Sequence, residues 1–183
     1  MIAVIAGTNR TGNNSIKVAR EVAGQYRGLG EEVEMLDLCS LPVEAFKGNA
    51  YKEKPEMVVE GFINKVLGAD GLVVVVPEYN GSFPGILKHF IDLLPFPESF
   101  ECRPVAFIGL AAGYYGGLRA VEQLQMVFAY RNAYLFNRRV FIPAVHKVLD
   151  GQGNLADEDL KNRLVAQAEK FLGFVRALKE SGR

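Results

Sequence analysis

The chain has 183 residues, of which 49% are hydrophobic and 23% are charged, the balance of a folded globular protein rather than of a disordered chain. Lys and Arg together number 21, as do Asp and Glu, so no net field attracts nucleic acid or an anionic membrane. No apolar run approaches the roughly 20 residues that span a bilayer, and the first run, Ile2–Ala6, is too short for a signal peptide. We therefore expect a cytoplasmic protein with one domain over residues 1–183, and neither nucleic acid nor a membrane as its partner.

Short apolar runs alternate with longer stretches in which apolar residues recur at helical spacing. The runs predict strands and the stretches predict helices. The run of branched apolar residues at 72–76 has no polar face, so it predicts a central strand that is covered on both sides. Segment 41–54 has no clear period and predicts a loop, and Asp157 predicts the N-cap of the last helix. In chain order we expect strands at Ile2–Ala6, 32–38, 72–76, 105–110 and Val140–Ile142, and helices at 13–28, 55–69, 83–94, 117–133 and 157–179.

Strands that are separated by helices predict a parallel sheet with right-handed crossovers and helices on both faces. The expected fold is therefore α/β, with one doubly wound domain. We take it as a flavodoxin-like three-layer α/β/α sandwich around a five-stranded parallel sheet of order 2-1-3-4-5. Ligands of such sheets bind beyond the carboxyl ends of the strands, at the point where the strand order reverses. In this order the loops after strands 1, 3 and 4 meet at that point.

The loop after the first strand has the composition of a phosphate cradle: Gly7-Thr8-Asn9-Arg10-Thr11-Gly12-Asn13-Asn14-Ser15. Its glycines let the backbone turn, its hydroxyl and amide side chains supply neutral donors, and the N–H groups at a helix N-terminus attract an anion. Arg10 adds a planar group that can hold a phosphate with two hydrogen bonds. The loop is neither a P-loop nor a GxGxxG fingerprint. A capped turn with a surface arginine stays the alternative interpretation.

Two further loops carry unusual residues at the same expected edge. Pro77-Glu78-Tyr79-Asn80-Gly81-Ser82-Phe83-Pro84-Gly85 follows the valine-rich strand, and its two prolines restrain a backbone that its two glycines free. A planar heterocycle needs a flat wall and polar backbone groups at its edge, which Tyr79 and the backbone of 78–82 would supply. The third loop, Leu110-Ala111-Ala112-Gly113-Tyr114-Tyr115-Gly116-Gly117, permits close approach of the backbone and offers two aromatic faces.

These features resemble those of the NADPH-dependent FMN reductases, a flavodoxin-like group that includes quinone, chromate and azo-compound reductases. The resemblance extends over essentially the full length of the chain. It depends on Gly7-Thr8-Asn9-Arg10, on Pro77-Glu78-Tyr79-Asn80 with Pro84-Gly85 and Lys88, and on Gly113 with Gly116-Gly117 and Arg119.

The resemblance implies a site for FMN at the meeting point of the three loops. The phosphate would be held by Thr8, Arg10, Asn13, Asn14 and Ser15, and the isoalloxazine would be lined by Pro77, Glu78, Tyr79, Asn80 and Gly81, with Ala111, Ala112 and Gly113 at its other side. Family members often have a serine near the position of Ala111, so contacts from the third loop would come from its backbone. The resemblance also implies a homodimer or homotetramer with the flavin near the interface.

The expected activity is that of an FMN-dependent NAD(P)H oxidoreductase. A hydride would pass from NADPH, or from NADH, through bound FMN to a quinone-like, azo, chromate or flavin acceptor. Because the chemistry lies on FMN, we assign no catalytic side chain. A non-catalytic FMN-binding electron carrier or regulatory protein is the alternative, although electron carriers of this fold are usually acidic and this chain is neutral. A phosphoacceptor receiver domain is rejected because Pro77 and Gly7-Thr8 stand where it needs acidic residues.

The remaining reactive residues predict no metal site. Cys39 and Cys102 are far apart in the sequence and are expected to be core thiols. Neither His89 nor His146 has partners at the spacing of metal ligands. For the carboxylate of Glu78 we expect a hydrogen bond to nearby backbone, and polarisation of an acceptor is the alternative. The apolar side chains of the helix at 83–94, with Pro95-Phe96-Pro97 after it, exceed what one buried face needs, which suggests a subunit interface.

Overall fold

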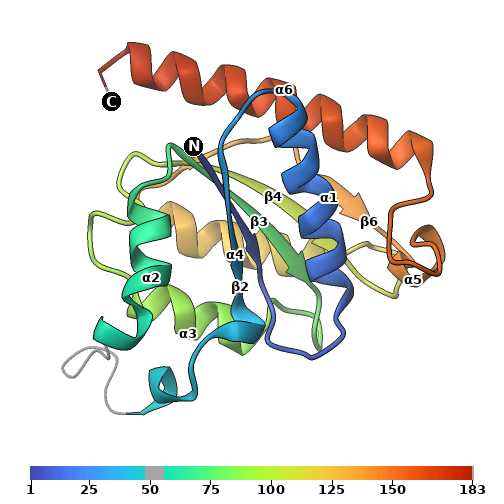
Figure 1. The fold of residues 1–183 in the computed structure, drawn as a ribbon, viewed down its shortest axis with the longest axis horizontal. Helices are drawn as coiled ribbons and strands as arrows, with labels where there is room; N and C mark the ends of the chain where they lie inside the picture. The colour runs from blue at the N-terminus through green and yellow to red at the C-terminus, as the bar shows by residue number, and fades with distance from the viewer. Residues whose placement is uncertain (48–55, 183) are drawn as a thin grey trace.

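The computed structural model describes residues 1–47 and 56–182 and has a parallel sheet at its centre (Figure 1). Its strands are β1 (Ile2–Ala6), β2 (Val33–Asp37), β3 (Gly71–Pro77), β4 (Pro104–Leu110), β5 (Tyr134–Leu135) and β6 (Val140–Ile142). They lie in the order β2-β1-β3-β4-β5, and β6 also pairs with β4. The predicted fold and strand order are therefore confirmed.

The fifth position of the sheet differs from the prediction because two short strands share it. β5 pairs with the start of β4, where Tyr134 lies opposite Pro104, and β6 pairs with its end, where Val140 lies opposite Ile108. Only Val140–Ile142 was expected here, since a run of two residues shows no period in the sequence.

A glutamine of the last helix fills the gap between β5 and β6. Gln167 is 1% exposed, and its Nε2 donates to the carbonyl oxygens of Phe107 at 3.1 Å and Arg138 at 2.6 Å. A buried carbonyl that lacks a donor is costly. The side chain of Gln167 therefore supplies a hydrogen-bond donor to the middle of β4, whereas β5 and β6 pair with its two ends.

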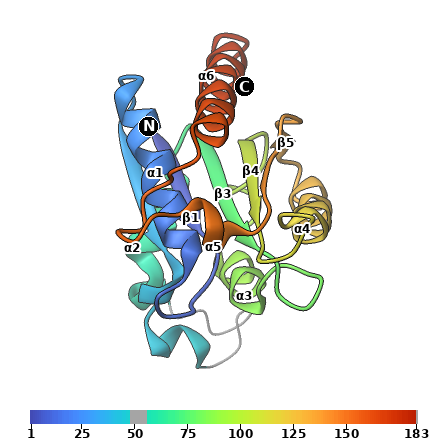
Figure 2. The ribbon, with the colours of Figure 1, turned by 90° about the vertical axis from the view of Figure 1, so that its right-hand side faces the viewer.

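Helices cover both faces of the sheet (Figures 1 and 2). The alternating residues of β3 divide between the two layers: Val73 and Val75 pack with one set of helices, and Leu72 and Val74 pack with the other. The valine-rich strand is thus covered on both sides, as expected. One face carries α1 (Asn14–Gly28) and α6 (Glu158–Glu180), and the other carries α2 (Glu56–Leu67), α3 (Gly85–Leu93) and α4 (Leu118–Tyr130).

The helix ends follow the capping residues in the sequence. The side chain of Asn13 accepts a hydrogen bond from the N–H of Ile16 at 2.8 Å, and that of Asp157 accepts one from Leu160 at 2.9 Å, so the predicted cap of the last helix is confirmed. Three short helical segments were not expected: the 3₁₀ turns η1 (Leu38–Ser40) and η2 (Val43–Phe46), and α5 (Val145–Val148). η2 lies within the predicted loop 41–54, of which residues 48–54 fall outside the described part.

The cysteines are not core thiols, and that expectation is wrong. Cys39 is exposed in η1, and Cys102 is partly buried in the turn before β4, with a φ of +55°. Both are free. In the part of the chain that the structure describes, no helix is long and apolar enough to cross a membrane.

Replacing Gln167 tests whether its side chain stabilises the sheet between β5 and β6. In Gln167→Leu the carbonyl of Phe107 stays buried and loses its donor, so we expect the free energy of unfolding to fall by about 1–3 kcal/mol. Urea denaturation followed by circular dichroism measures this change. The matched variant Gln152→Leu alters an exposed loop side chain and is expected to stay within about 0.5 kcal/mol of the parent. An equal fall in the free energy of unfolding in both variants would contradict the stabilising role of Gln167.

Candidate functional site

The loops after β1, β3 and β4 begin at one edge of the sheet because the strands are in register. Ala6 pairs with Val75, and Pro77 pairs with Leu110. Backbone hydrogen bonds continue this pattern beyond the strands, from Gly7 N to Val75 O at 2.9 Å and from Glu78 N to Leu110 O at 3.0 Å. The three loops that the sequence singled out therefore meet in space.

The first loop leads directly into the N-terminus of α1. The side chain of Asn13 holds the turn, because its Nδ2 donates to the carbonyl of Arg10 at 2.7 Å while its Oδ1 caps the helix. Ser15 follows in the first turn and is 1% exposed, and its hydroxyl has no hydrogen-bond partner among the described residues. The first N–H groups of a helix also lack partners within the helix. Unsatisfied donors thus gather where an anion would be stabilised.

The second loop is a tight hairpin turn. The N–H of Tyr79 donates to the carbonyl of Ser82 at 2.8 Å, and the N–H of Ser82 donates back to the carbonyl of Tyr79 at 3.0 Å. Asn80 and Gly81 lie between them with φ of +52° and +78°. Positive φ at both central residues defines a type I′ turn, for which Asn-Gly is the preferred sequence. From α4, the Nε2 of Gln123 donates to the carbonyl of Gly81 at 3.0 Å and fixes the turn further.

A hydrogen bond between side chains joins the first two loops. The hydroxyl oxygens of Thr8 and Tyr79 lie 2.8 Å apart, and Thr8 is fully buried. The Thr8 hydroxyl also accepts a hydrogen bond from the N–H of Arg10 at 3.3 Å. One buried hydroxyl therefore holds the position of Arg10 relative to Tyr79.

The third loop packs against β4 and against the segment before α5. Gly117 has a φ of +88°, and a Cβ atom there would lie 2.6 Å from the backbone N of Leu110, so only glycine fits. The N–H of Val145 donates to the carbonyl of Ala111 at 3.1 Å. This hydrogen bond brings the start of α5 to the site.

Two adjoining cavities lie between these loops, with volumes of about 350 and 210 Å³. They share Glu78, Ala111 and Ala112, and their combined volume lies within the usual range for a small-molecule site. The larger cavity contains the predicted residues Arg10, Asn13, Asn14, Ser15, Pro77, Glu78, Tyr79, Ala111 and Ala112, and the smaller one adds Asn80, Gly81 and Gly113. Thr8 is the exception among the predicted residues, because it supports the wall from behind.

Several lining residues were not assigned to the site from the sequence. Val145 comes from a short helix that has no pattern in the sequence. The smaller cavity is also lined by Tyr114, Tyr115 and Arg119. The sequence analysis noted the two aromatic rings and the arginine but assigned no ligand contact to them. Thr11, Gly12 and Leu110 complete the lining of the larger cavity.

The carboxylate of Glu78 pairs with Arg119 instead of the expected backbone group. Its Oε1 lies 3.4 Å from a guanidinium nitrogen of Arg119, and its Oε2 is buried with no partner among the described residues. The guanidinium also lies over the ring of Tyr115, 4.9 Å from its centroid. The expectation for Glu78 is therefore wrong, since α4 brings the opposite charge of Arg119 to its carboxylate.

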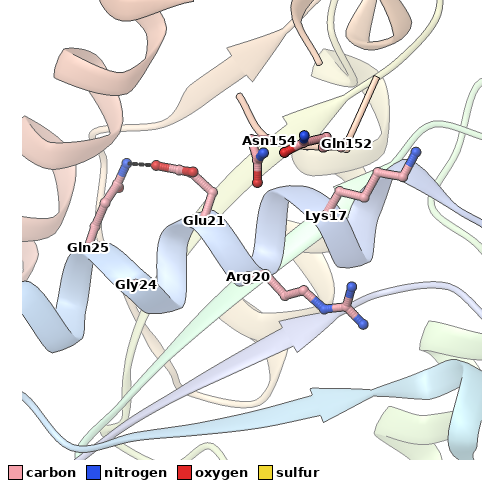
Figure 3. Close-up of a pocket in the computed structure, with 8 residues that line it drawn as sticks. Lys17, Arg20, Glu21, Gly24, Gln25, Gln152 and Asn154 are labelled. Carbon is pink, nitrogen blue, oxygen red and sulfur yellow. Dashed lines mark hydrogen bonds between the residues drawn. The ribbon is translucent and has the colours of Figure 1, made fainter. Parts of the chain in front are cut away.

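Another cleft, of about 520 Å³, lies between α1 and the loop before α6 (Figure 3). It contains none of the predicted site residues. Its charged groups are of mixed sign, with Glu21 accepting a hydrogen bond from Gln25 at 3.4 Å, and Arg20 points away from both. It has no aromatic wall, so it does not suit a planar ligand.

The described residues contain no group of three or more His, Cys, Asp or Glu side chains that could hold a metal ion. His89 instead has a structural contact: its Nε2 pairs with the carbonyl oxygen of Ala45 at 2.8 Å, and its ring stacks on that of Phe46.

Residues 1–147 match the family described as NADPH-dependent FMN reductase. The chain belongs to this family. Among its relatives, an NAD(P)H-dependent FMN reductase of Pseudomonas aeruginosa is 28% identical over 96% of this chain and 95% of its own. A quinone reductase of Escherichia coli strain K12 is 32% identical over 97% and 96% of the two chains.

The fold is also shared with a solved structure. The flavoenzyme NAD(P)H:(acceptor) oxidoreductase FerB from Paracoccus denitrificans superposes with a TM-score of 0.80 at 22% identity, covering 96% of this chain and 97% of that one. Membership of the NADPH-dependent FMN reductase family confirms the predicted FMN cofactor and the predicted NAD(P)H-linked oxidoreductase activity.

The larger cavity fits the FMN of this reductase family on its own geometry. One end has the N-terminus of α1, the unpartnered hydroxyl of Ser15 and the side chain of Arg10, which suit a phosphate. Pro77 and Ala111 add apolar groups to the lining, which suit a ring.

The hydrogen bond between Thr8 and Tyr79 predicts a shared effect on FMN affinity. Because the two side chains act through one contact, Thr8→Val and Tyr79→Phe should each raise the Kd for FMN about fivefold to tenfold. The double variant should add little to either single change. Quenching of FMN fluorescence measures all four Kd values. Fully additive losses would contradict a joint role.

Proposed function

We propose that this reductase holds FMN across the larger cavity, with the phosphate at the N-terminus of α1 and the ring between segments 77–81 and 111–113, and that it reduces a quinone. Bound FMN would supply the redox chemistry, a two-electron transfer from the reduced nicotinamide to the acceptor, while the residues of the cavity would hold and orient it. The observation that supports this most is the partnerless hydroxyl of buried Ser15 beside a helix N-terminus in that cavity.

The phosphate end depends on neutral donors and one cation. Burial of Ser15 removes its hydroxyl from water, so a hydrogen bond to an oxyanion satisfies a group that is otherwise left without a partner. Arg10 is exposed at the rim, where its guanidinium can close over a bound phosphate. The chain as a whole is neutral, so this affinity is local.

The ring end depends on rigid backbone. The type I′ turn and the Thr8–Tyr79 hydrogen bond hold segment 77–81, and the close packing of Gly117 on β4 holds segment 111–113. Rigid walls orient a planar ring without an ordering cost at each binding event. No described side chain is proposed to transfer a proton.

The acceptor class and the cellular setting are proposals as well. The quinone reductase of Escherichia coli spans nearly all of this chain, which supports a quinone acceptor here. NADPH and NADH are both proposed as donors. The single-domain organisation over residues 1–183 and the cytoplasmic location stay predictions of the sequence.

A homodimer is proposed on a surface that includes the end of the apolar segment that the sequence suggested. In the apolar segment that suggested an interface, Phe96 is exposed, whereas the other large side chains are buried within the chain: Ile86, Leu87, Phe90, Ile91, Leu93 and Leu94. Beside them, a cleft of about 670 Å³ between α3 and α4 exposes the side chains of Phe96, Met126 and Tyr130 by 65%, 67% and 81%. Exposed apolar residues that gather on one surface indicate a protein contact.

The activity is tested with the purified protein and FMN. We expect FMN to bind below micromolar concentration, and the loaded protein to oxidise NADPH when 1,4-benzoquinone is present, measured by the loss of absorbance at about 340 nm. A protein that binds FMN but oxidises neither NADPH nor NADH would be a carrier or regulator. A protein that fails to bind FMN would contradict the whole proposal.

The phosphate end is tested by comparing FMN with riboflavin, which lacks the phosphate. Ser15→Ala and Arg10→Ala each remove one donor, so we expect each to weaken FMN about tenfold while riboflavin affinity changes less than about twofold. Fluorescence titration measures the Kd of each variant relative to the parent, once for FMN and once for riboflavin. The control is Arg20→Ala, which alters an exposed arginine further along α1. If riboflavin weakened as much as FMN, the phosphate would have to bind elsewhere.

A further inference from the structure

The smaller cavity has an aromatic rim that FMN binding leaves unexplained. Tyr114 and Tyr115 are 88% and 54% exposed, and their rings meet edge to face with centroids 5.6 Å apart. Large aromatic side chains that stay in water contribute little to the folded core. Their place beside the proposed flavin site therefore suggests contact with a ligand.

Arg119 provides a charged group at this rim. Its side chain is 55% exposed, and its guanidinium is placed by the ring of Tyr115 and by Glu78. A guanidinium has five N–H donors, of which the described residues engage one, through the 3.4 Å contact with Glu78. Arg119 is thus fixed in position but keeps most of its hydrogen-bonding capacity.

The distribution of charge points to an anionic ligand group at this place. Of the described residues that line the two cavities, only Arg10 and Arg119 are positively charged. Arg10 lies at the end proposed for the FMN phosphate. A reduced dinucleotide carries several negative charges, and a neutral chain offers it no general attraction. Arg119 is then the cation available for its phosphates.

We propose that Arg119, Tyr114 and Tyr115 form the docking site for the phosphate and adenine groups of the reduced dinucleotide. This proposal rests on the proposed function. The guanidinium pairs with a phosphate, and the exposed ring of Tyr114 offers a flat face to the adenine. A quinone has neither group, so its binding does not depend on this rim.

Steady-state kinetics with full and truncated hydride donors test the proposal. The FMN-loaded parent, Arg119→Gln and Arg119→Lys are each compared with NADPH, NADH and 1-benzyl-1,4-dihydronicotinamide, which lacks phosphate and adenine. For Arg119→Gln we expect the KM for NADPH to rise about tenfold with little change in kcat, and Arg119→Lys to recover part of the loss. An equal rise for NADH identifies the pyrophosphate as the group bound, and a rise for NADPH alone identifies the 2′-phosphate.

The aromatic part is tested in the same assay. Tyr114→Ala should raise the KM for NADPH about fivefold through lost stacking, and Tyr114→Phe should keep the parent value. The matched control is Arg139→Gln, because Arg139 also lies over an aromatic ring, that of Phe141 at 5.4 Å, and pairs with Glu122 at 3.7 Å, but belongs to neither cavity lining. The control is expected to keep the parent kinetics.

The truncated donor separates the possible failures. Turnover with 1-benzyl-1,4-dihydronicotinamide shows that each variant is folded and loaded, and its kcat/KM should change less than about twofold. An unchanged KM for NADPH in Arg119→Gln, or an equal loss with the truncated donor, overturns the docking site while the proposed function stands. A parent that oxidises none of the donors overturns both.

Discussion

The register of β1, β3 and β4 is the constraint on which the site depends. The pairs Ala6–Val75 and Pro77–Leu110 set the ends of the strands at one edge. A shift of one residue in either pair would move every side chain of one strand to the opposite face of the sheet. Such a shift would also break the backbone hydrogen bonds from Gly7 N to Val75 O and from Glu78 N to Leu110 O, which carry the register into the loops. Packing and pairing of the strands therefore bring the three loops together, and the loops need only local hydrogen bonds to hold their shape.

Those local hydrogen bonds use polar side chains in places where the backbone alone leaves a gap. The hydroxyl of Thr8 joins the first two loops, and the amide of Asn13 donates to the carbonyl of Arg10 within the first loop. The amide of Gln167 donates to the carbonyl of Phe107 in β4, between the short strands β5 and β6. Each is buried and paired, so each adds specificity at little cost. Ser15 differs because it is equally buried and has no partner among the described residues. Tyr26 and Ser99 are also buried hydroxyls without a partner there, so it is the place of Ser15 in the lining of the larger cavity that makes it a candidate ligand group.

Much of this was accessible from the sequence, for reasons that the structure explains. The strands appeared because they are fully buried, and the three loops appeared because glycine, proline and amide residues cluster where strands end. Tyr134–Leu135 was not visible because two residues show no period. Thr8 was predicted to hold the phosphate through its hydroxyl. Its contact with Tyr79 was not predicted, because the two residues are 71 positions apart in the sequence. The pairing of Glu78 with Arg119 likewise depends on how α4 packs, which composition does not encode.

The central claim is that FMN spans the larger cavity with its phosphate at the N-terminus of α1. A crystal structure of the protein with FMN tests it most directly. The account predicts phosphate oxygens within hydrogen-bonding distance of the Ser15 hydroxyl, at about 2.5–3.0 Å, and a ring between segments 77–81 and 111–113. A phosphate bound away from loop 7–15, or FMN in the cleft between α1 and the loop before α6, would contradict it.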